Sequence, residues 1–300
     1  MPTWHSLLNE IRARGSTFDV VRRERLKTLA EKTGRNVIIY YSGWLQKPKI
    51  PGTQVTDADK NGFMTVIHGL DRTKGLDLIL HTPGGQVAAT ESLVDYARKM
   101  FGTNIEVFVP QIAMSAGTMI ACAAKKIYMG KQSNLGPIDP QFNGIPAYGV
   151  IEEFERALSE IREDQSKIPI WQVIISKYHP TFIGKCQNAI EWSKQIVTDW
   201  LTTGMFDGEP NPQQSAETVV GQLTNRVNMR THSRHLSAEK SKSYGLKIED
   251  LESDNDLQDL VLTVHHCFMH TFSNSAAIKI VENHDGVAIV HQVQIVQKRQ

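Results

Sequence analysis

Two short stretches of the sequence contain residues that could do chemistry together. The first, "HTPGGQVAAT", places Gly84 and Gly85 directly after the apolar run "LDLIL". The second, "VPQIAMSAGTMIACAA", places Ser115 among small residues. A serine hydroxyl can attack a carbonyl carbon when a base accepts its proton, and backbone N–H groups can stabilise the negative charge that develops on the carbonyl oxygen. The two stretches therefore suggest a serine nucleophile beside an oxyanion site.

Each stretch also has a purely structural interpretation. A serine in front of a helix is most often an N-cap, and two glycines after a strand are most often a turn. Their occurrence in neighbouring strand–helix units is more specific than either pattern alone. In the catalytic interpretation, Gly84 or Gly85 donates one N–H group to the oxyanion, Ala116 donates the other, and Ser115 is the nucleophile.

The segments around these residues alternate between predicted strands and predicted helices. The run "LDLILH" is almost continuously apolar, as expected for a strand covered on both faces. Predicted strands occupy 36–45, 76–81, 104–110 and 126–130, and predicted helices occupy 58–70, 87–100 and 116–124. This order predicts an α/β fold with a mainly parallel sheet and right-handed crossovers. Ligands bind at the carboxyl ends of such strands, which is where the glycines and the serine fall.

The rest of the chain is richer in helices and ends in a predicted β-hairpin. Helices are predicted at 4–14, 18–33, 150–164, within 180–203, and at 215–225, 235–246 and 257–273. The hairpin joins 278–283 to 286–296. We expect N-terminal helices over 1–35, a main α/β domain over 36–252, and a C-terminal helix and hairpin over 253–300 whose alternating edge could pair between identical subunits.

Composition excludes several classes of protein. The 300 residues are 40% hydrophobic and carry a formal net charge of +1, so no strong field attracts nucleic acid or anionic lipid. No apolar run reaches the roughly 18 residues of a membrane span, and the charged N-terminus lacks the apolar region of a signal peptide. Three widely spaced cysteines argue against a disulfide framework. These features predict a cytoplasmic protein that has no membrane span and binds no nucleic acid.

The two stretches, together with "KQSNLGPIDPQF", resemble the serine dehydrogenase proteinase family. That family lies within the Clp protease and signal peptide peptidase A group of the crotonase-like superfamily. The resemblance covers roughly residues 36–252. It implies a ClpP/crotonase-like ββα spiral, a Ser115 acyl-enzyme, backbone oxyanion donors at Gly84, Gly85 and Ala116, and hydrolysis of peptide bonds without metal or cofactor. It also implies peptide or unfolded-protein substrates and assembly of identical subunits into a ring.

The base that activates Ser115 stays open at this point. Clp-like relatives use a histidine whose position falls near Pro140 here, and no histidine is nearby. Relatives of the signal peptide peptidase kind use a lysine, whose position falls near Lys167, beside the apolar run "IPIW". His179 in "KYHPTF" is the alternative base. Asp139 in "GPIDPQ" is a third candidate, which could orient a base, hold a substrate amine or cap a turn.

Two other functions fit the same fold. A crotonase-like acyl-CoA enzyme would use the two N–H donors for a thioester enolate and would need no nucleophile at Ser115. A non-catalytic oligomeric scaffold would need neither. His81 is expected to serve in packing or in substrate contact, and the motif "VHHCFMH" at 264–270 is interpreted as an amphipathic helix in preference to a zinc site.

Overall fold

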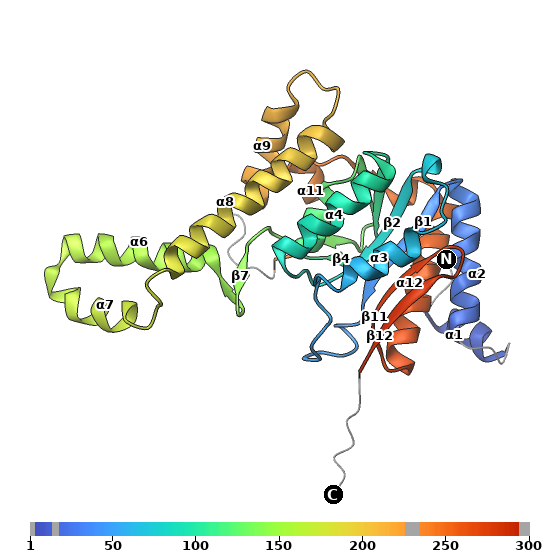
Figure 1. Cartoon of the computed structure of the whole chain (residues 1–300), viewed down its shortest axis with the longest axis horizontal. Helices are drawn as coiled ribbons and strands as arrows, with labels where there is room; N and C mark the ends of the chain where they lie inside the picture. The colour runs from blue at the N-terminus through green and yellow to red at the C-terminus, as the bar shows by residue number, and fades with distance from the viewer. Residues whose placement is uncertain (1–3, 14–17, 226–233, 294–300) are drawn as a thin grey trace, which may run out of the picture.

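A seven-stranded sheet forms the centre of the computed structural model, which describes residues 4–13, 18–225 and 234–293 (Figure 1). The strand order is β10-β5-β3-β2-β1-β11-β12. The pairings from β10 to β1 are parallel, and β11 and β12 are antiparallel additions beside β1. The strands are β1 (Asn36–Ser42), β2 (Leu76–His81), β3 (Ile105–Val109), β5 (Lys126–Met129), β10 (Ile248–Asp250), β11 (Ala277–Asn283) and β12 (Ala288–Gln292).

Helices cover both faces of this sheet. On strand β2, Leu78 and Leu80 point to one face and Ile79 points to the other, and all three side chains are buried. The first face packs against α3 (Asp59–Ile67), α4 (Val87–Phe101), α5 (Ala116–Cys122), the end of α8 (Phe182–Trp200) and α9 (Pro212–Leu223). The second face packs against α2 (Phe18–Thr33) and α12 (Asn255–Asn274), with α1 (Trp4–Ala13) on α12. The buried strands are apolar because neither face meets water.

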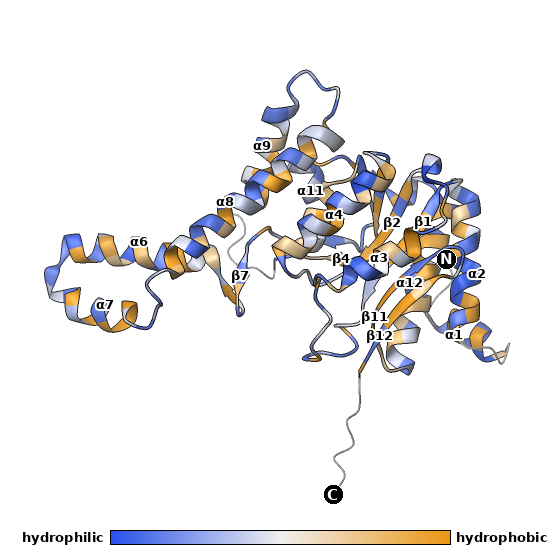
Figure 2. Ribbon diagram, viewed as in Figure 1, coloured by the Kyte–Doolittle hydropathy of each residue, from blue (hydrophilic) through white to orange (hydrophobic). Residues whose placement is uncertain are grey.

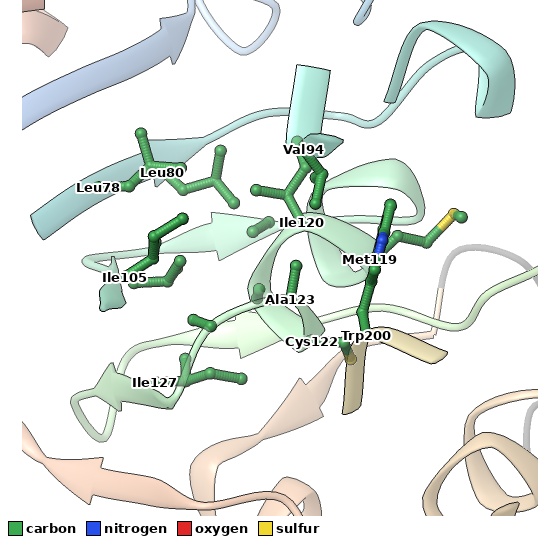
Figure 3. Close-up of a cluster of buried hydrophobic side chains, with 14 of the residues drawn as sticks. Leu78, Leu80, Val94, Ile105, Met119, Ile120, Cys122, Ala123, Ile127 and Trp200 are labelled. Carbon is green, nitrogen blue, oxygen red and sulfur yellow. The ribbon is translucent and has the colours of Figure 1, made fainter. Parts of the chain in front are cut away.

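Helix α5 is anchored in the core of the first face. Its residues Met119 and Ile120 lie with Leu78 and Leu80 of β2 and Val94 of α4 in one buried cluster (Figure 3). Every residue of α5 is buried. The start of this helix is therefore fixed relative to the end of β2.

Small strands extend the fold beyond the central sheet. A second sheet has the order β4-β6-β9, with β4 (Ile112–Ala113), β6 (Asn134–Leu135) and β9 (Leu236–Ser237). A short hairpin pairs β7 (Gln141–Phe142) with β8 (Ile145–Pro146). The helical turns η1 (Arg72–Lys74), η3 (Leu201–Met205) and η4 (Leu251–Ser253) and the helix α11 (Ala238–Ser243) connect the larger elements.

A helical arm projects away from the sheet (Figure 1). It consists of α6 (Ala147–Glu163), η2 (Gln165–Lys167), α7 (Ile168–Ile175) and the first half of α8. The arm has a small core of its own, formed by Ala147, Val150, Cys186 and Ile190 with aromatic neighbours. Apolar and polar residues alternate along these helices (Figure 2), as expected for helices that pack on one side only. The second half of α8 then joins the main core.

The predicted α/β fold with a mainly parallel sheet, a helix-rich second half and a C-terminal hairpin is confirmed. The N-terminal helices were also predicted within one residue at each end. The hairpin strand predicted over 286–296 is β12 as far as Gln292, and residues 294–300 lie outside the described part. The three cysteines are free and buried. Within the described residues, no helix combines the length and apolar character that a membrane span requires.

Two buried histidines lie on the second face of the sheet. The His265 Nδ1 atom is 3.2 Å from the Tyr41 hydroxyl, and the His81 ring lies 5.3 Å from the Tyr41 ring and 5.4 Å from the His265 ring. His81 therefore packs between β1 and α12. Burial lowers the pKa of His265 to about 3, with a further contribution from His266. Burial also lowers the pKa of His81 well below its ordinary value, and His265 adds to this effect.

These histidines predict a loss of stability in acid. Below a pH of about 6.5 the unfolded chain protonates His265 and the folded protein does not, so the free energy of unfolding falls as the pH drops toward 3. The variant His265→Gln removes one such proton and should reduce this pH dependence by about 1.4 kcal/mol per pH unit near pH 5. Urea unfolding between pH 7 and pH 4.5 measures the slope. The exposed His68, changed to Gln, is the control and should leave the slope unchanged.

Candidate active site

The carboxyl end of β2 lies beside β4, at the end of the central sheet where the parallel strands finish. Thr82, which follows β2, forms a parallel bridge with Ala113 of β4. The Thr82 N–H donates to Ile112 O at 3.2 Å, and the Met114 N–H donates to Thr82 O at 3.0 Å. The chain continues from each strand into the next residues of interest, which are the glycines on one side and Ser115 on the other. The sequence did not predict β4, which inserts an extra strand between β3 and Ser115.

Gly84 touches the turn that holds Ser115. Its φ of 99° lies in the left-handed region that favours glycine. A Cβ atom at Gly84 would lie 2.8 Å from both Met114 O and Ser115 Cβ, and 3.1 Å from Ala116 N. Real side chains do not pack this closely. The structure therefore brings together the Gly-Gly turn and the serine turn, and only glycine fits between them.

Ser115 occupies a strained turn between β4 and α5. Its φ of 52° and ψ of −112° are unusual for a residue with a side chain. It stands at the N-cap position of α5, but its side chain makes no capping hydrogen bond. The half-buried serine instead lines a cavity. A strained strand-to-helix turn that presents a serine in this way is typical of serine hydrolases.

Two backbone N–H groups near Ser115 remain available for a ligand. Among the described residues, neither the Gly85 N–H nor the Ala116 N–H donates to a protein acceptor. Ala116 is the first residue of α5, where no intrahelical acceptor can reach. The Gly84 N–H, in contrast, donates to the Thr82 hydroxyl at 3.2 Å. The geometry thus favours Gly85 over Gly84 as the donor that acts with Ala116.

The cavity in front of Ser115 has a volume of about 970 Å³. The Gly-Gly turn, the start of α4, the segment before β7, the β7–β8 turn and one face of α8 form its walls. Among its described lining residues, Lys185 is the one basic side chain and Asp139 the one acidic side chain. Burial raises the pKa of Cys186, next to Lys185 in the chain, and the charge of Asp139 adds to this shift. Asp139 thus lies close enough to α8 to act on this end of the helix.

Helix α5 also holds the segment that leads to Asp139. The buried Thr118 hydroxyl donates to Gly136 O at 2.9 Å and accepts from the Gly136 N–H at 2.9 Å. The Ile138 N–H then donates to Leu223 O at 3.1 Å. Asp139 therefore enters the cavity from a segment tied to the same helix that begins at Ser115.

The structure does not bring the two predicted bases to this cavity. Lys167 lies in η2, between the two packed helices α6 and α7, and its Nζ atom is 3.6 Å from Glu160 Oε2. His179 is exposed before α8, with Nδ1 3.1 Å from the Thr181 hydroxyl. Neither residue lines the cavity. Both residues lie in the arm, where α6 packs against α8 and α7 instead of against the sheet (Figure 1).

Sequence reasoning missed Lys185. The cavity-facing residues of α8 recur every three or four positions, which is the spacing of one helix face. These residues are Lys185, Asn188, Ala189, Trp192 and Ser193. The pattern is visible in "GKCQNAIEWSK", but nothing in the sequence alone shows that this face meets the Gly-Gly turn.

The fold and this juxtaposition define a ClpP-like α/β protein with a candidate serine nucleophile. The chain belongs to the ClpP-like SDH-type serine proteinase family, whose model matches residues 14–261. This agrees with the family resemblance found in the sequence.

Two uncharacterized proteins of Methanocaldococcus jannaschii are similar in sequence. MJ0137 is 38% identical over 114 residues, which make up 38% of this chain and 40% of that protein. MJ1495 is 28% identical over 194 residues, which make up 65% of this chain and 59% of that protein. The chain thus spans less than two thirds of the length of either relative.

Two solved structures of the 1510-N membrane-bound stomatin-specific protease are similar in fold. A serine-to-alanine mutant matches with 16% identity and a TM-score of 0.41, covering 69% of this chain and 79% of that one. A lysine-to-alanine mutant in complex with a substrate peptide matches with 16% identity and a TM-score of 0.39, covering 65% of this chain and 70% of that one.

The surroundings of Gly85 and Gly221 predict opposite effects of alanine substitution on the free energy of unfolding. A Cβ atom at Gly85 would lie 2.3 Å from Val55 O and 2.4 Å from Val55 N, so Gly85→Ala must displace a backbone segment. We expect it to lower the free energy of unfolding by about 1–3 kcal/mol. Gly221 is exposed in α9 with no atom near its would-be Cβ. Gly221→Ala should stabilise the protein by about 0.5–1 kcal/mol. Equal stability of the two variants in urea unfolding would contradict the close approach.

Proposed function

We propose that this protein is a serine peptidase that hydrolyses peptide bonds through an acyl-enzyme at Ser115. One observation carries the proposal. The Ser115 side chain caps no helix, sits on a strained turn at a cavity wall, and lies beside the unused N–H groups of Gly85 and Ala116. Membership of a serine proteinase family supports the same chemistry.

The proposed reaction has two halves. Ser115 Oγ attacks the carbonyl carbon of the scissile peptide bond while its proton passes to a base, and Gly85 and Ala116 stabilise the resulting oxyanion. The C–N bond then breaks as the base returns the proton to the leaving amine. Water attacks the ester in the second half, with the same base accepting its proton, and Ser115 is released unchanged.

We propose Lys185 as that base. Among the described residues that line the cavity it is the one basic side chain, and we propose that Asp139, which lines the same cavity, orients it or holds a substrate amine. The earlier candidates Lys167 and His179 would reach this cavity only from a second copy or after movement of the arm.

The cavity favours an extended peptide with an apolar side chain. Its volume, about 970 Å³, exceeds what one residue fills. Its apolar lining includes Val87, Met119, Ile138, Phe142 and Trp192. We therefore propose peptides or unfolded chains as substrates, cleaved internally.

We also propose that copies of this chain assemble, as ring-forming relatives of the Clp group do. The arm presents apolar side chains to solvent that its own core does not use, among them Leu158, Ile170 and Val173. The edge strand β12 of the C-terminal region 253–300 is a second candidate contact, because its outer side has no partner strand among the described residues.

Substitutions of Ser115 should abolish activity while the protein stays folded. Ser115→Ala should abolish labelling by a fluorophosphonate probe and lower the rate of peptide hydrolysis by at least a thousandfold, with the fold unchanged. Ser115→Gly should be equally inactive but about 1 kcal/mol more stable than Ser115→Ala, because glycine relieves the positive φ. Labelling, casein or peptide turnover and thermal unfolding of the three proteins provide the measurements.

Two results would contradict the proposal. Labelling that persists in Ser115→Ala places the nucleophile elsewhere. An unlabelled wild-type protein favours the acyl-CoA enzyme if thioesters turn over, or the scaffold if they do not.

Three variants decide which residue is the base. Lys185→Met should lower kcat by about a hundredfold or more, because a general base contributes about 10²–10⁴ in rate. Lys167→Met and His179→Gln should each stay within about threefold of wild type, as expected for residues outside the cavity. The measurement is the pH dependence of kcat/KM. A loss confined to Lys167→Met would refute the assignment of Lys185 and indicate a base supplied by another copy.

A further inference from the structure

A buried ion pair joins the C-terminal hairpin to the first residue of α3. Lys279 of β11 and Asp59 of α3 have side chains exposed by 2% and 0%, and the distance from Lys279 Nζ to Asp59 Oδ1 is 2.6 Å. The pair lies on the same face of the sheet as α3, beside strand β1. The mechanism proposed above does not use it. Burying two charges is costly, so the contacts that surround this pair need an explanation.

Both members of the pair hold the backbone of residues 53–56. Lys279 Nζ donates to Gln54 O at 2.8 Å, and Asp59 Oδ2 accepts from the Thr56 N–H at 2.8 Å. The Tyr40 hydroxyl donates to the same Asp59 oxygen at 2.8 Å and fixes the carboxylate. Segment 53–56 belongs to no helix or strand, so these bonds, together with the bond that the Ser42 hydroxyl donates to Thr53 O at 2.7 Å, set its position.

Segment 53–56 in turn holds the Gly-Gly turn. The Val55 N–H donates to Gly84 O at 2.8 Å, and the Gln86 N–H donates to Val55 O at 3.0 Å. Val55 and Gly85 form a parallel bridge, and the backbone of Val55 occupies the space where a Gly85 side chain would lie. In this bridge Val55 bonds to the residues on either side of Gly85, which leaves the Gly85 N–H unbonded.

We infer that Asp59 and Lys279 are positioning residues for the oxyanion donor at Gly85. The inference rests on the proposed function and deepens it. The ion pair holds Gln54 and Thr56, and these two residues hold Val55 between them. Val55 in turn bonds to both peptide units that flank Gly85, one of which contains the Gly85 N–H group. The C-terminal hairpin, through Lys279, thereby becomes part of the machinery that orients the N–H group toward the carbonyl oxygen.

A shift of this donor should affect the transition state more than the bound substrate. The oxyanion carries full charge only as the tetrahedral species forms, so a displaced donor lowers kcat and leaves KM nearly unchanged. Displacements of about 1 Å in such sites cost about a hundredfold in rate.

The test uses a double variant that leaves no unpaired buried charge. Asp59→Asn with Lys279→Met removes both charges, keeps an acceptor for Thr56 and removes the donor to Gln54. The matched control is Arg35→Met with Asp77→Asn. That pair is 2.5 Å apart, also bonds to backbone carbonyls, and lies at the opposite end of β1 and β2.

We expect only one of the two double variants to lose catalytic rate and to exchange its amide protons faster. The double variant Asp59→Asn with Lys279→Met (the 59/279 variant) should lose about tenfold to a hundredfold in kcat, with KM within about threefold of wild type. Amide hydrogen exchange in segments 53–56 and 83–86 should become faster, because their bonds to each other loosen. The control double variant, Arg35→Met with Asp77→Asn, is called the 35/77 variant. The 35/77 variant should keep wild-type kcat and wild-type exchange in both segments, even where its melting temperature falls as far.

Three outcomes are decisive. A 59/279 variant that only melts earlier, with unchanged kcat and exchange, overturns the inference and leaves a purely structural ion pair. Equal losses of kcat in both double variants overturn it as well. If the wild-type protein fails to label with fluorophosphonate, the proposed function fails separately, and exchange in 53–56 and 83–86 still decides whether the ion pair positions the glycines.

Discussion

The contact between Gly84 and the Ser115 turn is the constraint on which the rest of the site depends. The segment that follows β2 and the segment that contains β4 run parallel and are joined by hydrogen bonds at Thr82. Where they reach Gly84 and Ser115, they are so close that no side chain fits between them. The packing of α5 in the main core fixes one side of this contact. The Val55 bridge fixes the other side. The proposed convergence of one hydroxyl and two amides depends on these contacts on both sides.

The sequence predicts those parts of the site that depend on local signals. Apolar runs and glycine turns define β2 and the turn after it, and parallel topology brings the ends of neighbouring strands to one edge. The base could not be predicted in the same way, because the path of the helices after Asp139 decides which basic residue lies at the cavity. Helix α6 has the amphipathic pattern expected, whereas α7 was not predicted, and no sequence pattern shows that α6 packs on α8 and places Lys167 in the arm. Lys185 lies at the cavity instead, because one face of α8 forms part of the cavity wall.

The connection between Lys279 and Asp59 was equally invisible in the sequence. The two residues are far apart in the chain, and the sequence predicted a C-terminal helix and hairpin without showing which strand they pair with. Strand β11 lies antiparallel beside β1 in the main sheet. A lysine within the apolar strand "IKIVEN" looks like an outward-facing residue in a sequence pattern, whereas here it is almost completely buried against a carboxylate.

The groups proposed to bind the oxyanion at this site are peptide amides. This has a consequence for how such a protein can change during evolution. Genetic drift can replace nearly every side chain around the cavity while the stereochemistry of two glycines and one serine is retained. Substrate preference can therefore change much faster than the reaction itself. Descendants of one ancestor would then keep the same main-chain geometry long after most of their residue identities had been lost.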